Sequence, residues 1–231
     1  MINLVTLFQQ QFKREVLVQV RQLRSLINTS LFFLMIMFFF PLTLPPAPAL
    51  LHTIIPGISW IAMLLAMLLS AERIFQQDVD DGVVEQWLVS GQPLAFIVAI
   101  KIIAHWILTV LPMLLLSPII ALLFALNLHQ TLTIMLSLAC GSPAILFLCA
   151  LAAAFGISLQ QKSVLIGLIL LPLTIPVMIF GSGAITAALH GLPIKGHLAL
   201  MSAISLISIG LLPSAIAGVI GITTTDSMSV S

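Results

Sequence analysis

Long apolar runs alternate with short polar intervals along the chain, and this pattern predicts six membrane-spanning helices. An apolar run of about 18 or more residues is typical of a transmembrane helix. Such runs cover residues 25–44, 54–71, 96–126, 131–158, 163–188 and 198–220. Six spans place both termini on the same side of the membrane. The predicted fold is an all-α membrane domain over 25–220, followed by a short tail over 221–231.

The N-terminal segment, residues 1–24, has a different pattern. Apolar residues recur at three- and four-residue steps from Val5 to Leu23, whereas Arg14 and Arg21 fall opposite them. A helix of this kind is amphipathic and suits the membrane–water interface, where its basic residues meet anionic lipid. An ordinary helix packed on protein is the alternative. We expect an interfacial helix, because a hydrophobic span follows at once.

The composition indicates a single integral membrane domain. Hydrophobic residues make up 61% of the 231 residues and charged residues 6%, and no soluble domain of this size buries so much apolar surface. The formal net charge of +1 gives no sign of nucleic-acid binding. The chain has neither a G-x-x-x-x-G-K-[ST] run nor a visible Ser–His–Asp arrangement. We therefore expect no catalysis by this chain, and ATP-driven work would need a separate polypeptide.

The distribution of lysine and arginine orients the spans. With the N-terminus in the cytoplasm, seven of the eight lysines and arginines lie at or near the inner surface, and Lys195 lies outside. Cytoplasmic loops carry an excess of these residues, so we predict that both termini are cytoplasmic. The polar interval 72–94 is then cytoplasmic too. The segments 45–53, 127–130 and 189–197 form short external loops.

The cytoplasmic interval contains an acidic stretch, 78-DVDDGVVE-85, which holds four of the seven acids of the chain. If residues 72–90 form a helix, an apolar stripe and a carboxylate stripe run along it, and the acids face the cytoplasm. The stripes are Phe75, Val79, Val83 and Trp87 on one side and Asp78, Asp81 and Glu85 on the other. Gly82 interrupts this pattern, so two short helices at an angle are also possible.

Three uses of the acidic stretch are open from its residues. The first is a solvated loop helix, which is the common reason for charge on a loop. The second is a metal site, but no His or Cys joins the acids and the EF-hand spacing is absent. The third is a docking surface on which a cytoplasmic motor domain could push. Composition favours the first.

Lys101 and His105 are the polar residues of interest within a span. They lie four residues apart and share a helix face, with Lys101 near the inner surface, where its side chain can snorkel to water. An ionisable residue inside a membrane suggests a functional site. The alternative for His105 is a neutral imidazole that forms a hydrogen bond with a neighbouring helix.

Several stretches resemble one protein family. The specific ones are 72-ERIFQQDVDDGVVEQW-87 and 101-KIIAHW-106, and supporting ones are 12-FKRE-15, 112-PMLLLSPIIALLF-124, 141-GSPAILFL-148 and 171-LPLTIPVMIFG-181. Together they resemble the haem exporter protein B family, the permease subunits of the cytochrome c maturation ABC transporters. The resemblance covers nearly the whole chain. The family's D-x-x-D-G-x-x-E motif matches Asp78, Asp81, Gly82 and Glu85, although Val83 and Val84 replace a small residue and a leucine.

This resemblance implies an ABC-2-type permease in the bacterial inner membrane, with an elbow helix at its N-terminus. The implied partners are a cytoplasmic ABC ATPase, a haem-handling membrane protein, a small accessory subunit and a periplasmic haem chaperone. ATP hydrolysis would drive haem export or release of the haem-loaded chaperone, and a second permease copy is expected because ABC permeases usually work in pairs. Residues 72–90 then resemble a coupling helix. Its coupling residues would be Phe75, Asp78, Val79, Asp81, Gly82, Glu85 and Trp87.

Other functions stay open from the sequence. The chain could be an ABC-2 permease for a different export substrate, a scaffold that transports nothing or, less readily, a secondary carrier. The resemblance assigns haem binding to the partner protein, so no bound cofactor or metal is predicted in this chain. The external histidines are then ordinary loop residues rather than haem ligands: His52, His129, His190 and His197.

Overall fold

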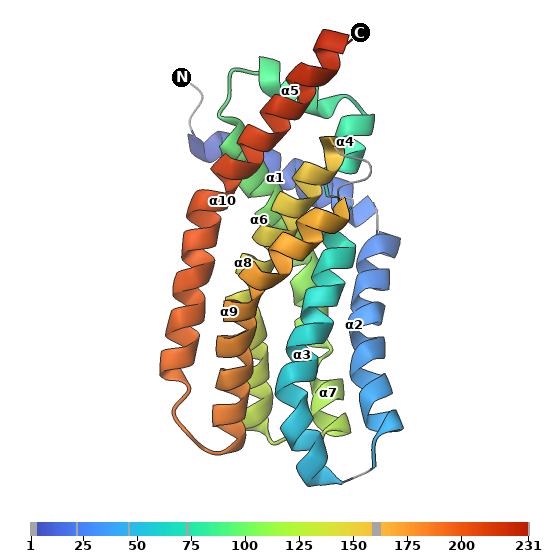
Figure 1. The fold of residues 1–231 in the computed structure, drawn as a ribbon, viewed down its shortest axis with the longest axis vertical. Helices are drawn as coiled ribbons and strands as arrows, with labels where there is room; N and C mark the ends of the chain where they lie inside the picture. The colour runs from blue at the N-terminus through green and yellow to red at the C-terminus, as the bar shows by residue number, and fades with distance from the viewer. Residues whose placement is uncertain (1–3, 22, 46, 73, 159–162, 231) are drawn as a thin grey trace.

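The computed structural model describes residues 4–230 except 22, 46, 73 and 159–162. Every regular element in this part of the chain is an α-helix (Figure 1). The helices are α1 (Leu4–Arg21), α2 (Leu23–Thr43), α3 (Pro48–Ala71), α4 (Gln76–Asp80), α5 (Val83–Val89), α6 (Leu94–Leu115), α7 (Ser117–Leu123), α8 (Leu128–Ser158), α9 (Ser163–Leu189) and α10 (Lys195–Val230).

Six helical segments are long and apolar enough to cross a membrane, which confirms the predicted all-α, six-span fold. They are Arg24–Thr43, Ala49–Asp80, Leu94–Leu123, Leu128–Gly156, Pro172–Leu189 and Lys195–Ile222. Two helices extend furthest beyond their predicted spans. α3 begins at Pro48 rather than at residue 54, and α10 continues through the predicted tail to Val230.

The third predicted span, 96–126, is divided into α6 and α7. The division falls at Leu116, between the two prolines of this span. Pro118 has no N–H to donate to the carbonyl of Leu114, so the helix ends and a new one begins with a proline in its first turn. The sequence predicted one continuous span here, and the structure shows two helices separated at Leu116.

The core is centred on Trp60, whose indole is fully buried where α3 meets α8 and α9. Two glycines make room for this ring. A Cβ atom added to Gly181 on α9 would overlap the indole, and one added to Gly141 on α8 would lie 2.5 Å from it. Close approach of helices through glycine is typical of membrane helix packing. Here it holds the central helices of the bundle together.

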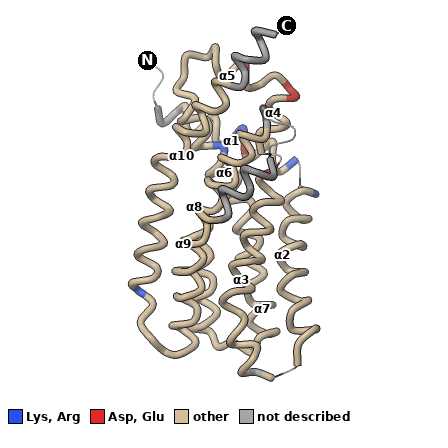
Figure 2. The backbone as a smooth tube through the Cα atoms, viewed as in Figure 1, with Lys and Arg blue, Asp and Glu red and all other residues tan. Residues whose placement is uncertain are grey.

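Both termini lie at one end of the bundle, where α1 runs across the helices and α4 and α5 form a cap (Figure 1). Most of the charged residues that the structure describes gather at this same end (Figure 2), whereas Lys195 begins α10 at the other end. The same uneven distribution of lysine and arginine along the sequence predicts the orientation of the protein in the membrane. Arg73 and Lys162, which contributed to that argument, lie outside the described residues.

The acidic stretch forms two short helices rather than one. α4 ends at Asp80, and Gly82 then adopts φ +66° before α5 begins at Val83. A positive φ is easily reached by glycine and is strained for residues with a Cβ. The left-handed residue changes the helical phase, so side chains before and after Gly82 do not lie on one continuous stripe.

Candidate functional site

A buried ion-pair cluster lies at the end of the bundle that carries the charges, and Lys101 of α6 is its centre. The Lys101 ammonium Nζ lies 2.6 Å from Asp78 Oδ2 of α4 and 3.1 Å from Glu15 Oε2 of α1. It also lies 5.9 Å from the ring centroid of Trp87 on α5, within the range of a cation–π interaction. One side chain thus contacts three separate helices.

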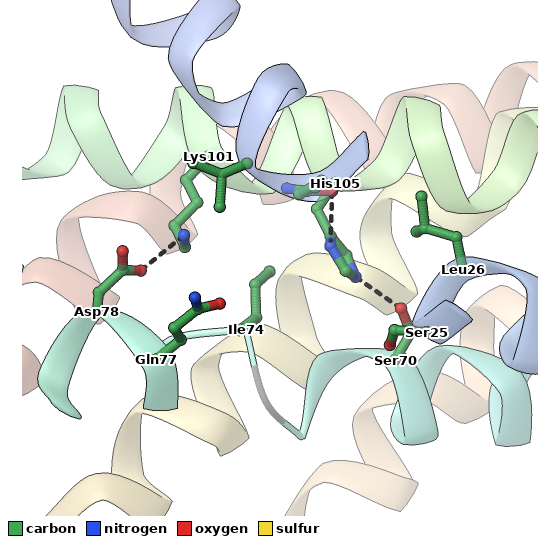
Figure 3. Close-up of a pocket in the computed structure, with 10 residues that line it drawn as sticks. Ser25, Leu26, Ser70, Ile74, Gln77, Asp78, Lys101 and His105 are labelled. Atoms are coloured by element: carbon green, nitrogen blue, oxygen red, sulfur yellow. Dashed lines mark hydrogen bonds and ion pairs between the residues drawn. The ribbon is translucent and has the colours of Figure 1, made fainter. Parts of the chain in front are cut away.

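This arrangement corrects two expectations. Lys101 was expected to snorkel towards water, but its side chain is only 7% exposed. Asp78 was expected to face the cytoplasm, but its side chain is 13% exposed and turned inward to Lys101 (Figure 3). A buried ammonium group is costly unless it is paired and hydrogen-bonded. Glu15 provides an ion pair with a hydrogen bond, and Asp78 provides a second ion pair.

His105 lies one helical turn beyond Lys101 and is the centre of a second polar chain. Its Nδ1 is 3.1 Å from Gln19 Oε1 of α1, and its Nε2 is 2.6 Å from Ser70 Oγ of α3. The amide oxygen of Gln19 only accepts, so His105 Nδ1–H donates to it and Nε2 accepts from the Ser70 hydroxyl. Thr109, 3.4 Å from Ser70, can in turn donate to it. A neutral imidazole satisfies every member of this chain.

The ion-pair cluster around Lys101 and the hydrogen-bonded chain around His105, which we call the two polar chains, contact α1 with the same residue spacing. Glu15 and Gln19 are four residues apart on α1, and their partners Lys101 and His105 are four residues apart on α6. The two helices therefore run in the same direction over this turn, and a contact between the rings of Phe8 and Phe96, with centroids 6.5 Å apart, extends the register towards both N-termini. α1 is attached to α6 by a matched pair of polar contacts.

A small pocket opens between the polar chains (Figure 3). Its volume is about 60 Å³, which has room for a few water molecules. Besides members of the two chains it is lined by Val18, Ser25, Leu26, Ile74 and Gln77. Sites for cofactors and drug-sized ligands have volumes of about 300–1,000 Å³, so this pocket does not hold a haem.

No metal-ligand cluster of His, Cys, Asp or Glu occurs among the described residues. The external histidines are not arranged as a group: His129 and His190 are exposed, and His52 and His197 are half-buried. His197 packs close to the backbone of Gly183. In the part of the chain that the structure describes, none of these histidines belongs to a group of three or more metal-ligating side chains.

The structure divides the two predicted stripes of the 72–90 segment into a buried set and an exposed set. One set packs against the bundle: Phe75 and Trp87 are buried, Val79 and Val83 are half-buried, and Asp78 is held by Lys101. The other set, Asp81 and Glu85, is exposed. Asp80 is exposed as well, which the motif does not mark. We call Asp80, Asp81 and Glu85 the acidic surface.

Four members of the polar chains were not singled out from the sequence: Glu15, Gln19, Ser70 and Thr109. A signal existed for the first two. Glu15 is the one acid in residues 1–24, a segment that otherwise carries only positive charges. Glu15 and Gln19 also repeat the four-residue step of Lys101 and His105. The predicted interfacial residues Arg14 and Arg21 lie on the exposed side of α1.

These features define a multi-pass, all-α membrane protein of the permease class. A family model described as CcmB protein matches residues 6–223 of the chain. The chain belongs to this family.

Curated relatives carry the name heme exporter protein B. The chain is 41% identical to the one from Pseudomonas aeruginosa, over 88% of this chain and 92% of the relative. It is 40% identical to the one from Haemophilus influenzae, over 94% and 98% of the two chains. The relative from Escherichia coli K12 is 38% identical over 86% and 90%. These alignments cover nearly the whole length of each relative.

Proposed function

We propose that this chain is the membrane subunit of a haem-export complex that serves cytochrome c maturation in the bacterial inner membrane. Membership of the CcmB family and the name heme exporter protein B of its relatives support the haem-export role. A separate cytoplasmic ATPase supplies the energy, since the sequence has no phosphate-binding loop. The subunit itself is not an enzyme.

The observation that carries the proposal is the attachment of the α4–α5 segment to α6. Trp87 and Asp78 fix the segment to Lys101, while the acidic surface of Asp80, Asp81 and Glu85 points away from the bundle. Such a segment suits docking to basic groups of an ATPase, because exposed charges at an interface set the rate and specificity of association. Its buried side chains then transmit displacement of the segment to the bundle.

Within this proposal Lys101 is a positioning residue. When the ATPase moves the α4–α5 segment, the ion pair to Asp78 carries the movement to α6, and the ion pair to Glu15 carries it on to α1. The three elements move together, because separation of any of them leaves a charge unpaired in a buried place.

The size of the pocket bears on what the complex does with haem. The polar pocket beside Lys101, at about 60 Å³, and an apolar groove lined by Trp60, Ile175 and Ile179, at about 230 Å³, are both smaller than the usual volume of a cofactor site. Haem handling then involves surfaces made with other chains: a second permease copy, the haem-handling membrane protein, the accessory subunit or the periplasmic chaperone. We favour release of the haem-loaded chaperone as the step that ATP hydrolysis drives.

The test reverses charge on the acidic surface without touching the buried anchors. We expect Asp81→Lys with Glu85→Lys to reduce co-purification of the ATPase with the tagged chain and to reduce c-type cytochromes, while the thermal stability of the chain is unchanged. Lys195→Glu, a charge reversal at the opposite end of the bundle, is the control and should change neither. Undiminished co-purification and normal c-type cytochromes in the double variant would contradict the coupling role.

A strain that lacks the gene separates the proposed substrate from others. Loss of all c-type cytochromes supports cytochrome c maturation. Normal c-type cytochromes, with an ATPase still bound to the tagged chain, would instead indicate a permease for another exported molecule.

A further inference from the structure

One arc of α1 carries cations and apolar side chains together. At 100° per residue, five side chains fall within about 120° of the helix circumference: Lys13, Arg14, Leu17, Val20 and Arg21. All five are exposed, and the two apolar ones are exposed to 52% at Leu17 and 41% at Val20. We call these five residues the outer arc. It lies away from the face that α1 turns towards α6.

The outer arc has no negative charge to balance it. Glu15, the one acid of residues 1–24, is turned to the opposite side of α1 and is 3% exposed, because it pairs with Lys101. None of Lys13, Arg14 and Arg21 has an ion-pair partner among the residues that the structure describes. Because Glu15 is held in the buried ion pair, the only charges on the outer arc are positive.

The connection to α2 fixes the place of this surface. Arg24 begins the first membrane-spanning segment, only three residues after Arg21. The outer arc therefore lies within a few turns of the hydrocarbon boundary, at the end of the bundle where the charges gather (Figure 2). The layer next to that boundary contains the phosphate groups of the lipids.

We propose that the outer arc is a binding surface for anionic phospholipids of the leaflet that α1 lies against. Lys13, Arg14 and Arg21 contact the phosphate groups, where the arginines can form paired hydrogen bonds. Leu17 and Val20 enter the upper part of the acyl layer. The surface does not depend on the proposed ATPase, and it holds α1 between lipid on one side and α6 on the other.

The test uses the full-length chain in nanodiscs of phosphatidylcholine with increasing phosphatidylglycerol. We expect the melting temperature of the wild type to rise with the phosphatidylglycerol fraction, and more so at low salt, because exposed charges are screened by salt. In the variant Lys13→Gln/Arg14→Gln/Arg21→Gln the rise should disappear. Lys195→Gln, a neutralised exposed lysine at the other end of the bundle, is the matched control and should behave as the wild type.

Native mass spectrometry of the same samples gives a second readout. The preference for phosphatidylglycerol over phosphatidylcholine should fall about fivefold for each cation removed. The single variants Arg14→Gln and Arg21→Gln should each show a partial loss, which keeps the test informative if the triple variant folds poorly.

Two results would overturn the proposal. One is a triple variant that keeps the full response to phosphatidylglycerol. The other is a wild type that shows no lipid preference while the triple variant loses a protein partner in cells, since the arc would then bind an acidic protein surface. Failure of the proposed haem-export function would leave both readouts unchanged, because neither uses the ATPase or haem.

Discussion

Lys101 Nζ lies 2.6 Å from Asp78 Oδ2, and this ion pair fixes the start of the acidic segment to the middle of the chain. Asp78 is the first residue of the family's acidic motif, yet it faces the bundle. The motif therefore combines an anchor, Asp78, with an exposed part, Asp81 and Glu85. Substitutions in these two parts should have different consequences.

Replacement of Lys101 with methionine should strongly destabilise the protein. The change leaves the carboxylates of Glu15 and Asp78 buried without a counter-ion, and the loss of one partner of a buried pair costs about 3–5 kcal/mol. Thermal unfolding of the purified chain in detergent measures the effect. Lys101→Arg keeps the charge and should cost clearly less, whereas equal melting temperatures for Lys101→Met and the wild type would contradict the role of the ion pairs.

Asp78→Asn and Asp81→Asn make the same chemical change in different surroundings. We expect Asp78→Asn to lower stability by about 1.5–3 kcal/mol, since it removes a charge-assisted contact to Lys101. Asp81→Asn, at an exposed position, should stay within about 0.5 kcal/mol of the wild type. Thermal unfolding of the two variants side by side checks this. Equal effects would mean that the inward orientation of Asp78 is wrong.

Gly82→Ala should cost about 1–2 kcal/mol, because Gly82 has φ +66° between α4 and α5 and alanine is strained there. Gly210→Ala, inside α10 with open space around the added Cβ, is the control and should be neutral or slightly stabilising. Limited proteolysis of the 72–94 segment gives a second measurement. The cleavage rate should rise in Gly82→Ala, and an unchanged rate and melting temperature would count against the turn.

Gly181→Ala should destabilise the bundle by about 1–3 kcal/mol through overpacking, since the new methyl group would overlap the Trp60 indole. Trp60→Leu costs stability by itself but makes room for this methyl group. In the double variant, Gly181→Ala should therefore add little further loss of melting temperature. Simple additivity of the two single effects would show that the two residues do not share this contact.

The span pattern was predictable because it depends on local hydropathy. Apolar runs must cross the hydrocarbon layer whatever their neighbours are, so all six spans were identified from the sequence. The break at Leu116 depends on the missing N–H of Pro118. The sequence showed that proline but not whether the helix bends or ends there, which depends on how the neighbouring helices pack.

The inward orientation of Asp78 was not predictable from periodicity. A continuous helix places Asp78, Asp81 and Glu85 on one stripe. In the structure α4 ends at Asp80, so Asp81 lies beyond the helix, and the left-handed Gly82 separates the phase of α5 from that of α4. The partners of Lys101 also lie on helices distant in the chain, and no local pattern specifies which helices meet. The hydrogen-bonded His105 was, by contrast, among the alternatives that the sequence offered.

The shared four-residue spacing of the contacts between α1 and α6 limits how α1 can slide along α6. If α1 slid along α6 by one turn, Gln19 would face Lys101 and Glu15 would face the buried apolar Ile97, or Glu15 would face His105 and leave Lys101 behind. The first slide would strand the Glu15 carboxylate in an apolar setting, and the second would leave Lys101 with Asp78 as its one remaining counter-ion of the described pair. The paired contacts therefore favour one register between α1 and α6. We expect the two helices to move together as a rigid unit.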